Sequence, residues 1–387
     1  MKARKAVALV ALLSVGTLVA CGDGGDGEST ATTAGGETTD GGETTDGGGE
    51  AVCPEKLTIQ TDWFPELEHG GTYQLIGPNG TASKDSVSYS GPVQEQYAVG
   101  GLKEIEITTI KFDKANSSVL VDGEADMAYI GIADVIKESS LGLVAIMKTL
   151  DKDPQMVMWD PAQYDIQKPE DIAGTGATVL HFPGVAYIDY MIGKGYMTAD
   201  QSNPSYDGSD AKWVAESGSI FQQGFATNEV YKYENEIAWK DGAPADVSFY
   251  TVGEIGFDNY PAAITMTQAK AAELSDCLKL LVPKMAQAWI DFYNDPTPVM
   301  DAMIEINATH DGFWGLSKEL NAAGIALLEE KGIGANSPDG TYCSLDPGKV
   351  QAMYDLLAPI YAEQGVEIND SIEGLFDNQY CEGAPGR

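Results

Sequence analysis

The sequence predicts an α/β protein built from two successive series of strands and helices. Short runs typical of strands alternate with helical stretches between residues 57 and 147, and again between residues 155 and 252. The last third of the chain is helical, because its apolar residues recur at spacings of three and four. With 387 residues, 43% of them hydrophobic, the chain is long enough to form two or three lobes around sizeable cores.

The first series is expected to run from residue 57 to residue 147. Its strands are expected at 57–61, 105–110, 125–130 and 143–147, and its helices at 116–121 and 132–139. A polar insert at 78–91, with Gly and Ser throughout, is expected to form a surface loop or hairpin. Because strands alternate with helices, the pattern predicts a parallel sheet with crossover connections.

The second series begins after Asp151. A helix is expected to start at Lys168-Pro169-Glu170-Asp171 and to end at Gly174. Strands are expected at 155–159, 178–181, 225–227 and 247–252, and a further helix at 185–194. Two amphipathic helices follow, and we expect their apolar stripes to be core: Leu281, Met285, Ala288, Trp289 and Phe292 in one, and Val350, Met353, Tyr354, Leu357 and Tyr361 in the other.

The charge of the chain restricts its partners. Lys and Arg together number 23 against 59 Asp and Glu, which gives a formal net charge of −36. Such a surface repels phosphate backbones, so a nucleic-acid-binding protein is excluded. The two arginines are Arg4 and Arg387, so the folded region lacks the usual guanidinium clamp for carboxylate, sulfonate or phosphate groups. A site rich in acids and aromatic rings instead suits a neutral or protonated heteroaromatic solute that carries amino groups.

The N-terminus is typical of an exported lipoprotein. Basic residues precede a short apolar run at 6–20, which is too short to span a bilayer and predicts a secretory signal at 1–20. Leu18-Val19-Ala20-Cys21 resembles a bacterial lipobox, with lipid on the Cys21 thiol; the alternative is an ordinary signal peptide with an incidental cysteine. Residues 22–51 hold eight acids, no basic residue and mostly small residues, and are expected to be a disordered linker. We therefore expect a protein exported and lipid-anchored to the outer face of the cytoplasmic membrane.

Four further cysteines remain: Cys53, Cys277, Cys343 and Cys381. An even number in an exported chain predicts two disulfides, and three pairings are possible. No metal site is expected, since the chain has no C-x-x-C motif or Cys/His cluster and its three histidines are far apart in sequence.

A motif directly after the first expected strand resembles one in a known family. Asp62-Trp63-Phe64-Pro65, followed by His69-Gly70, is similar to the D-W-x-P-N-x-x-H-x-G motif of the thiamine-pyrimidine-binding proteins. These are solute-binding components of ABC importers, related to the nitrate-, sulfonate- and taurine-type binders and to the yeast enzyme that makes the same pyrimidine. Further segments resemble the same family at 123–131, at 168–174 before a second lobe, and at 223–229.

The resemblance implies a type II periplasmic-binding-protein fold, in which two α/β lobes are joined by two hinge strands and the ligand lies in the cleft between them. The lobes would comprise 52–151 plus 260–387, and 152–259. Loops after the strands of both lobes would converge on the cleft, as α/β sheets bind ligands at the carboxyl ends of their strands. The implied protein is a monomer without enzyme activity or cofactor, which passes a small heteroaromatic solute, similar to the thiamine pyrimidine precursor, to an ABC permease and ATPase.

The candidate ligand-binding residues follow from the motif and from the strand ends. Trp63 is expected to be a stacking platform, Asp62 an acceptor for amino groups, and His69 a cleft residue. The structural alternatives are a tryptophan that covers the core, an aspartate that caps a helix and a buried structural histidine. The other candidates are Phe64, Tyr129, Gly131, His181, Phe182, Gly184, Asn228, Glu229 and Tyr250, of which Tyr250 is equally suited to packing at a hinge.

Two departures from the family and two rival functions remain open. Glu66 stands where the motif has Asn, and the insert at 78–91 is unusual. The Cys-rich stretch of the yeast enzyme is absent, which argues against a synthase. One rival is a binder of nitrate, sulfonate, taurine or a flavin-like ligand on the same fold. The other is an extracellular enzyme, although the chain has no G-x-S-x-G, H-E-x-x-H or P-loop motif.

Overall fold

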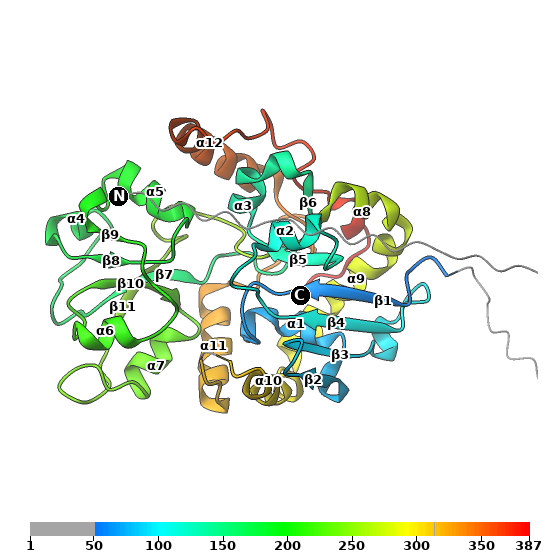
Figure 1. Ribbon diagram of the computed structural model, residues 1–387, viewed down its shortest axis with the longest axis horizontal. Coiled ribbons are helices and arrows are strands. Elements are labelled where there is room, and N and C mark those ends of the chain that lie inside the picture. The colour runs from blue at the N-terminus through cyan, green and yellow to red at the C-terminus, as the bar shows by residue number, and fades with distance from the viewer. Residues whose placement is uncertain (1–50, 313) are drawn as a thin grey trace, which may run out of the picture. The chain divides into compact units, whose positions relative to one another are not determined.

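The computed structural model describes residues 51–312 and 314–387, which form two β-sheets surrounded by helices (Figure 1). The expected signal peptide, the lipidation site Cys21 and nearly all of the linker lie outside the described residues. Within the described part of the chain, no helix combines the length and the apolar character needed to cross a membrane.

The larger sheet has seven strands in the order β2-β3-β4-β1-β5-β12-β6. Strands β4, β1 and β5 are parallel, as expected, but β3 and β12 run antiparallel to their neighbours, so the expectation of a parallel sheet is wrong for its flanks. The insert at 78–91 supplies the hairpin β2–β3, and β12 returns from the second sheet between β5 and β6. The strands are β1 Lys56–Gln60, β2 Thr81–Ser83, β3 Ser88–Pro92, β4 Glu104–Thr108, β5 Met127–Ile130, β6 Leu143–Lys148 and β12 Ala263–Thr267.

The smaller sheet has five strands in the order β11-β7-β10-β8-β9, and β7 runs antiparallel to both of its neighbours. The strands are β7 Gln155–Trp159, β8 Val179–Leu180, β9 Ser202–Asn203, β10 Phe221–Phe225 and β11 Ser248–Thr251. The strand expected at 225–227 is wrong, because β10 ends where it was expected to begin. The strand does not show as an apolar run in the sequence, because it contains two buried amides, Gln222 and Gln223. Their side-chain N–H groups donate to the Tyr233 hydroxyl and to Gln155 Oε1 respectively.

The helices cover both sheets, and α9 is the longest of those described. Its expected stripe from Leu281 to Phe292 is buried, and it packs against α1. A Cβ added at Gly71 of α1 would lie 2.2 Å from the Trp289 ring, so this close approach requires glycine. The helices are α1 Gly70–Gln74, α2 Asn116–Val121, α3 Ile132–Lys137, α4 Asp171–Thr175, α5 Ala186–Lys194, α6 Ala211–Ala215, α7 Glu229–Asn235, α8 Gln268–Glu273, α9 Ser275–Asn294, α10 Thr297–Thr309, α11 Lys318–Lys331 and α12 Pro347–Gln364.

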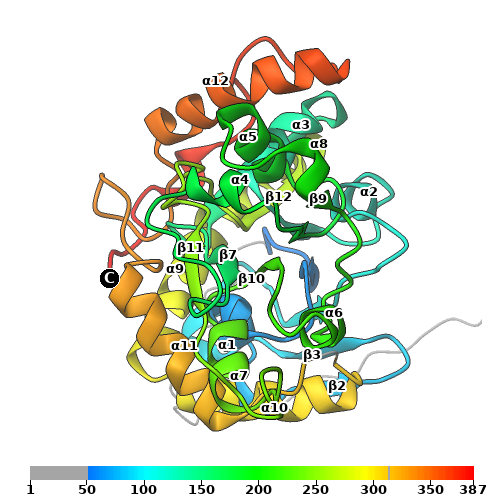
Figure 2. The same ribbon diagram turned by 90° about the vertical axis from the view of Figure 1, so that its left-hand side faces the viewer.

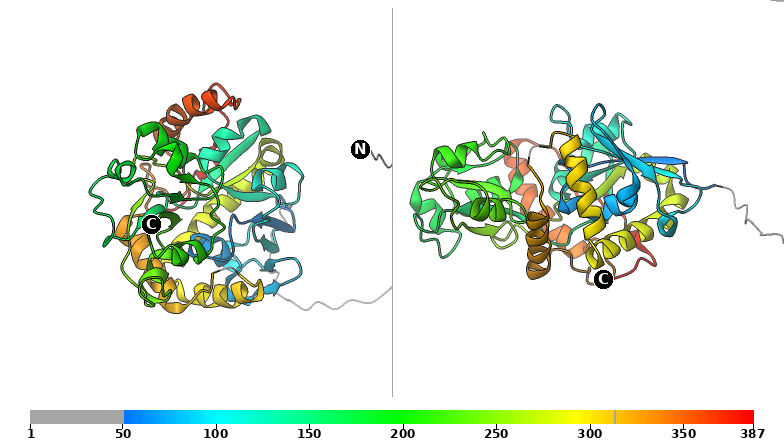
Figure 3. Two further views of the ribbon diagram at one scale, coloured as in Figure 1. Left: turned by 60° about the vertical axis from the view of Figure 1, so that its left-hand side comes forward. Right: turned by 90° about the horizontal axis from the view of Figure 1, so that it is seen from below.

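The chain passes between the two sheets twice, at 149–154 and at 252–262. Two C-terminal helices also contact helices that belong to both halves of the molecule. Helix α11 packs against α7 on one side and α10 on the other, and it lies between the two sheets when the molecule is seen from below (Figure 3, right). Helix α12 packs against both α3 and α5, and Figure 2 shows it above them.

Two disulfides join distant segments of the chain around the first sheet. Cys53, just before β1, is bonded to Cys277 in α9, and Cys343, just before α12, is bonded to Cys381 near the C-terminus. Two disulfides were expected, and the structure selects one of the three possible pairings.

Candidate functional site

A cavity of about 520 Å³ opens between the carboxyl ends of strands from both sheets. The loop after β1, the end of β5 and the start of α3 form the wall on the side of the first sheet. The loops after β8 and β9 and the segment between β10 and α7 form the opposite wall. This is where α/β folds place ligands, because the loops that follow neighbouring strands converge there.

Aromatic rings from both sheets meet at Trp63 in the loop after β1. The Trp63 ring centre lies 5.6 Å from that of Phe112 and 5.9 Å from that of Phe182, which follows β8 in the second sheet. The Phe182 ring in turn lies 4.8 Å from Tyr206. Gly208 has a φ of +88°, and a Cβ there would lie 3.1 Å from the Trp63 ring. Trp63 therefore contacts residues of both sheets at the cavity wall.

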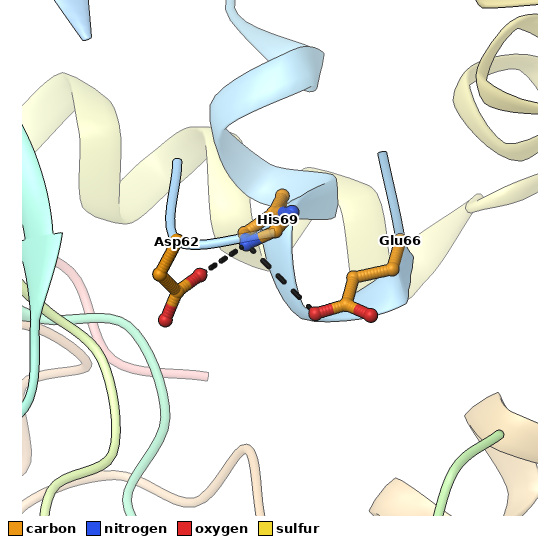
Figure 4. Close-up of side chains that lie close together, drawn as sticks. All are labelled: Asp62, Glu66 and His69. Carbon is orange, nitrogen blue, oxygen red and sulfur yellow. Dashed lines mark hydrogen bonds and ion pairs between the residues drawn. The ribbon is translucent and has the colours of Figure 1, made fainter. Parts of the chain in front are cut away.

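A small acidic cluster with one histidine, drawn in Figure 4, comes from the same loop after β1 and the turn that follows it. The Nε2 atom of His69 lies 2.7 Å from Asp62 Oδ1 and 4.0 Å from Glu66 Oε1. His69 is fully buried, whereas Asp62 and Glu66 line the cavity. Burial raises the pKa of the Glu66 carboxyl well above its ordinary value, and the neighbouring carboxylates Glu68 and Asp62 raise it further.

Two further buried carboxylates lie where the 3₁₀ turn Leu67–His69 meets the segment before α7. Glu229, the first residue of α7, accepts a hydrogen bond from the backbone N–H of Phe225 at 2.8 Å, and burial raises its pKa to about 7. Glu68 accepts a hydrogen bond from the Thr227 hydroxyl, and burial raises its pKa as well. Of the two, Glu229 lines the cavity, so a ligand group that donates hydrogen bonds would meet an acceptor here.

The positive side chains of the cavity are already neutralised. Lys111 and Lys114 line it, but Lys111 pairs with Glu124, and Lys114 lies 2.6 Å from Asp122 and 2.5 Å from Glu124. Among the described residues, no other Lys or Arg lines the cavity. The lining carboxylates are Asp62, Glu66, Asp134, Glu138 and Glu229. The cavity therefore has more acidic than basic groups, although burial raises the pKa of Glu66 well above its ordinary value, that of Asp134 to about 6 and that of Glu229 to about 7. A cation placed there would favour their ionised forms.

Of the residues expected to bind ligand, the structure brings seven to the cavity wall. These are Asp62, Trp63, Tyr129, Gly131, Phe182, Asn228 and Glu229. The binding role of each stays a prediction.

The other five do not line the cavity. Phe64 packs edge-on against Trp63, and His69 lies behind Asp62. The His181 ring bonds to Ser202 and to the Phe182 carbonyl, and Gly184 forms the turn into α5 with a φ of +80°. Tyr250, on edge strand β11, packs 5.2 Å from the Trp159 ring.

Sequence reasoning missed several lining residues, of which Trp314 is the largest. It lies in the loop between α10 and α11, with Lys232 Nζ 5.3 Å from its ring centre. Its neighbours Gly312 and Gly315 are the only local signal that this tryptophan lies in a loop. Tyr206, Gln155 and Gln223 also line the cavity, and nothing in their local sequence distinguishes them from core residues.

The fold of the chain is shared with known binding proteins. No family model and no curated protein sequence matches the chain. Among solved structures, it is similar to the periplasmic aliphatic sulphonate-binding protein SsuA from Escherichia coli, with a TM-score of 0.57, 12% identity, and coverage of 84% of this chain and 93% of that one. This chain has a type II periplasmic-binding-protein fold.

Two other structures show the same fold. The periplasmic nitrate-binding protein NrtA from Synechocystis PCC 6803 has a TM-score of 0.54 at 13% identity, covering 85% of this chain and 88% of its own. A ligand-binding component of an ABC-type import system from Staphylococcus aureus, with zinc bound, has a TM-score of 0.53 at 12% identity, covering 86% of this chain and all of its own. In the periplasmic-binding fold, two α/β lobes flank a cleft, and the cavity described above lies in that cleft.

Proposed function

We propose that the protein is an extracytoplasmic solute-binding protein of an ABC importer, which captures a small, positively charged heteroaromatic solute. The observation that carries this proposal is the lining of the cavity, where aromatic rings from both lobes surround carboxylates that have no free cation beside them. The fold supports the binding class, because the solved neighbours include the binding components of import systems.

The charge of the cavity favours a cationic ligand, whereas two of the similar solved structures are described as binders of anions. SsuA is described as a sulphonate binder and NrtA as a nitrate binder. In this chain, five carboxylates line the cavity, and its two lysines are paired with acids. An anion placed there would lose hydration and face like charges, whereas a protonated amine would gain from the same field. A sulfonate, nitrate or taurine ligand is therefore the less supported alternative.

The aromatic residues and acceptors define how such a solute would be held. Trp63, Phe182 and Tyr206 offer ring faces and edges, and a cation or protonated ring against them gains on the order of 1 kcal/mol for each contact. Glu229 and Asp62 would accept hydrogen bonds from its amino groups. A cavity of about 520 Å³ leaves room for an aminopyrimidine that carries a ring substituent, while a flavin-like ligand stays an alternative.

The same proposal covers the cellular setting of the protein. Lipid on Cys21 and the linker at 22–51 would hold the binding unit at the outer face of the cytoplasmic membrane, within reach of a permease with its ATPase. The lobes would be 52–151 plus 260–387, and 152–259, and would close around one ligand in a monomeric protein. This assignment requires no catalytic residue and no cofactor.

Calorimetry against a panel of solutes tests the proposal. The panel holds aminopyrimidines, a flavin, taurine, an alkanesulfonate and nitrate. We expect the tightest binding for an aminopyrimidine. Glu229→Gln should weaken that binding about tenfold through loss of an acceptor that ionises beside a bound cation. Glu216→Gln is the matched control, since it removes an equal charge from the end of α6, outside the cavity. Tight binding of nitrate or a sulfonate, undiminished by Trp63→Ala, would overturn both the ligand class and the site.

A further inference from the structure

The loop and turn after β1 place three metal-ligating groups around one point on the cavity wall. Asp62 Oδ1, Glu66 Oε1 and His69 Nε2 all lie within 4.8 Å of one another. Figure 4 shows the histidine nitrogen turned toward both carboxylates. The three residues come from one short segment, and the backbone N–H of His69 donates to the Glu66 carbonyl at 3.0 Å. The turn itself therefore fixes the relative positions of Glu66 and His69.

The Glu66 side chain is incompletely satisfied by the protein. It is 91% buried, and its Oε2 atom accepts a hydrogen bond from Asn228 at 3.3 Å. Its Oε1 atom accepts no hydrogen bond from any described residue and faces His69 Nε2 at 4.0 Å. Because Glu66 lines the cavity, this oxygen can take a partner from outside the protein, and a cation there would balance the charge of a carboxylate that is otherwise largely shielded from water.

We propose that Asp62, Glu66 and His69 chelate a divalent transition-metal ion on the cavity wall. The departure of this chain from the family motif supplies the second carboxylate, because Glu66 stands at the Asn position. One imidazole and two carboxylates without a thiolate suit Zn²⁺ or Mn²⁺, whereas Mg²⁺ and Ca²⁺ prefer oxygen ligands throughout.

The distances between the ligand atoms are compatible with such an ion. Metal–ligand bonds of about 2.0–2.2 Å in a tetrahedral site separate the ligand atoms by roughly 3.3–3.6 Å. The distances here begin at 2.7 Å and reach at most 4.8 Å, so side-chain shifts of about 1 Å bring all three atoms into range. Asp62 and Glu66 line the cavity, so the remaining coordination position faces the space that the solute would occupy. An unprotonated ring nitrogen of the solute, which keeps its lone pair, would complete the coordination sphere.

Calorimetric titration with the metal alone tests this inference. The full chain is first treated with a chelator and then titrated with ZnCl₂, MnCl₂ or MgCl₂ in the absence of any organic solute. We expect one bound Zn²⁺ or Mn²⁺ for each chain and much weaker binding of Mg²⁺. Glu66→Gln and His69→Gln should each weaken Zn²⁺ binding by at least about tenfold, since each removes a direct ligand.

The control variant accounts for the acidic surface of the chain. Asp276→Asn removes one charge from the exposed face of α9, so binding by general electrostatic attraction would respond to it as much as to Glu66→Gln. Glu66→Gln keeps the size of the side chain and so separates ligand loss from misfolding if His69→Gln does not fold. Equal Zn²⁺ affinity in Glu66→Gln and in the parent protein, or equal losses in Glu66→Gln and Asp276→Asn, would overturn the metal site. Solute binding without metal would leave the proposed function intact.

Discussion

The two lobes meet on two sides of the cavity, and the two junctions differ in chemistry. On the hinge side, an apolar core continues from one sheet into the other and includes Leu357 and Tyr361 of α12. On the opposite side, the hydrogen bonds that join the lobes are Glu68 with Thr227 and Glu66 with Asn228. The apolar contacts there, Trp63 with Phe182 and Leu327 of α11 with both lobes, involve side chains that are only partly buried. Apolar burial across a junction is lost only at a high cost, whereas polar groups that separate can bond to water instead. We therefore expect that, when the lobes separate, the hinge side stays packed and the Glu68 side opens.

Helix α12 carries the hinge-side packing between the lobes. Its Tyr361 hydroxyl donates to the Ala133 carbonyl in the first lobe, and Gln364 at its end donates to Asp189 in α5 of the second. Both crossing segments lie near this junction, and Asn259 of the second donates to Asp153 of the first. A helix bonded to both lobes at the hinge restrains how far the lobes can rotate.

The largest expected effect comes from removing apolar volume at the hinge. Leu357 is fully buried in the core that both lobes share, so Leu357→Ala should lower the free energy of unfolding by about 2–5 kcal/mol. Leu280→Ala is the matched control, because that leucine is 46% exposed on α9 and should cost less than about 0.5 kcal/mol. Urea unfolding measures both variants. Similar losses in the two would mean that α12 does not stabilise the junction.

The sequence predicts the helices and strands around the cavity better than it predicts which distant segments they contact. The Asp62–Pro65 motif directly follows a strand, and the expected helix at 116–121 has the bounds of α2. The local spacing of apolar residues and the residues that begin and end an element are sufficient to predict such elements. Trp314 lies more than 200 residues from Trp63 in the chain, and no periodicity relates them. The reversed direction of β12 and the pairing of Cys53 with Cys277 likewise depend on the path of the chain in space.

An intermediate effect concerns pH and the buried Asp153 at the hinge. Burial raises the pKa of this carboxyl from 3.8 to about 7, although hydrogen bonds from the Gln155 backbone and from Asn259 oppose the shift. Between about pH 4 and pH 7, the unfolded chain has lost this proton while the folded chain keeps it. The contribution to stability is therefore complete at acidic pH and declines as the pH rises to about 7, by on the order of 2–4 kcal/mol.

Asp153→Asn isolates this contribution from other buried acids. The variant does not titrate at this position, so its stability should fall less steeply from pH 5 to pH 7.5 than that of the parent protein. At pH 7.5 the variant should be the more stable of the two in urea unfolding. Parallel stability curves for the two proteins over this range would show that Asp153 is already ionised in the folded state.

The smallest expected effect is at the polar junction and concerns the balance between open and closed lobes. The Thr227 hydroxyl donates to Glu68 Oε1 across the junction, and Glu68 Oε2 is buried without a hydrogen-bond partner. Thr227→Val keeps the shape of the side chain but removes its only donor, which should destabilise the closed arrangement by about 1–2 kcal/mol. Solute affinity should fall roughly 5- to 30-fold, since closure must then be driven by binding energy. The free energy of unfolding should change much less than in Leu357→Ala, because opening exposes the two polar groups to water.

Thr227→Ser is the control that retains the hydroxyl and should keep most of the affinity. Scattering from the solute-free variants should give a larger radius of gyration for Val than for Ser, and equal radii with equal affinities would locate the opening of the lobes elsewhere.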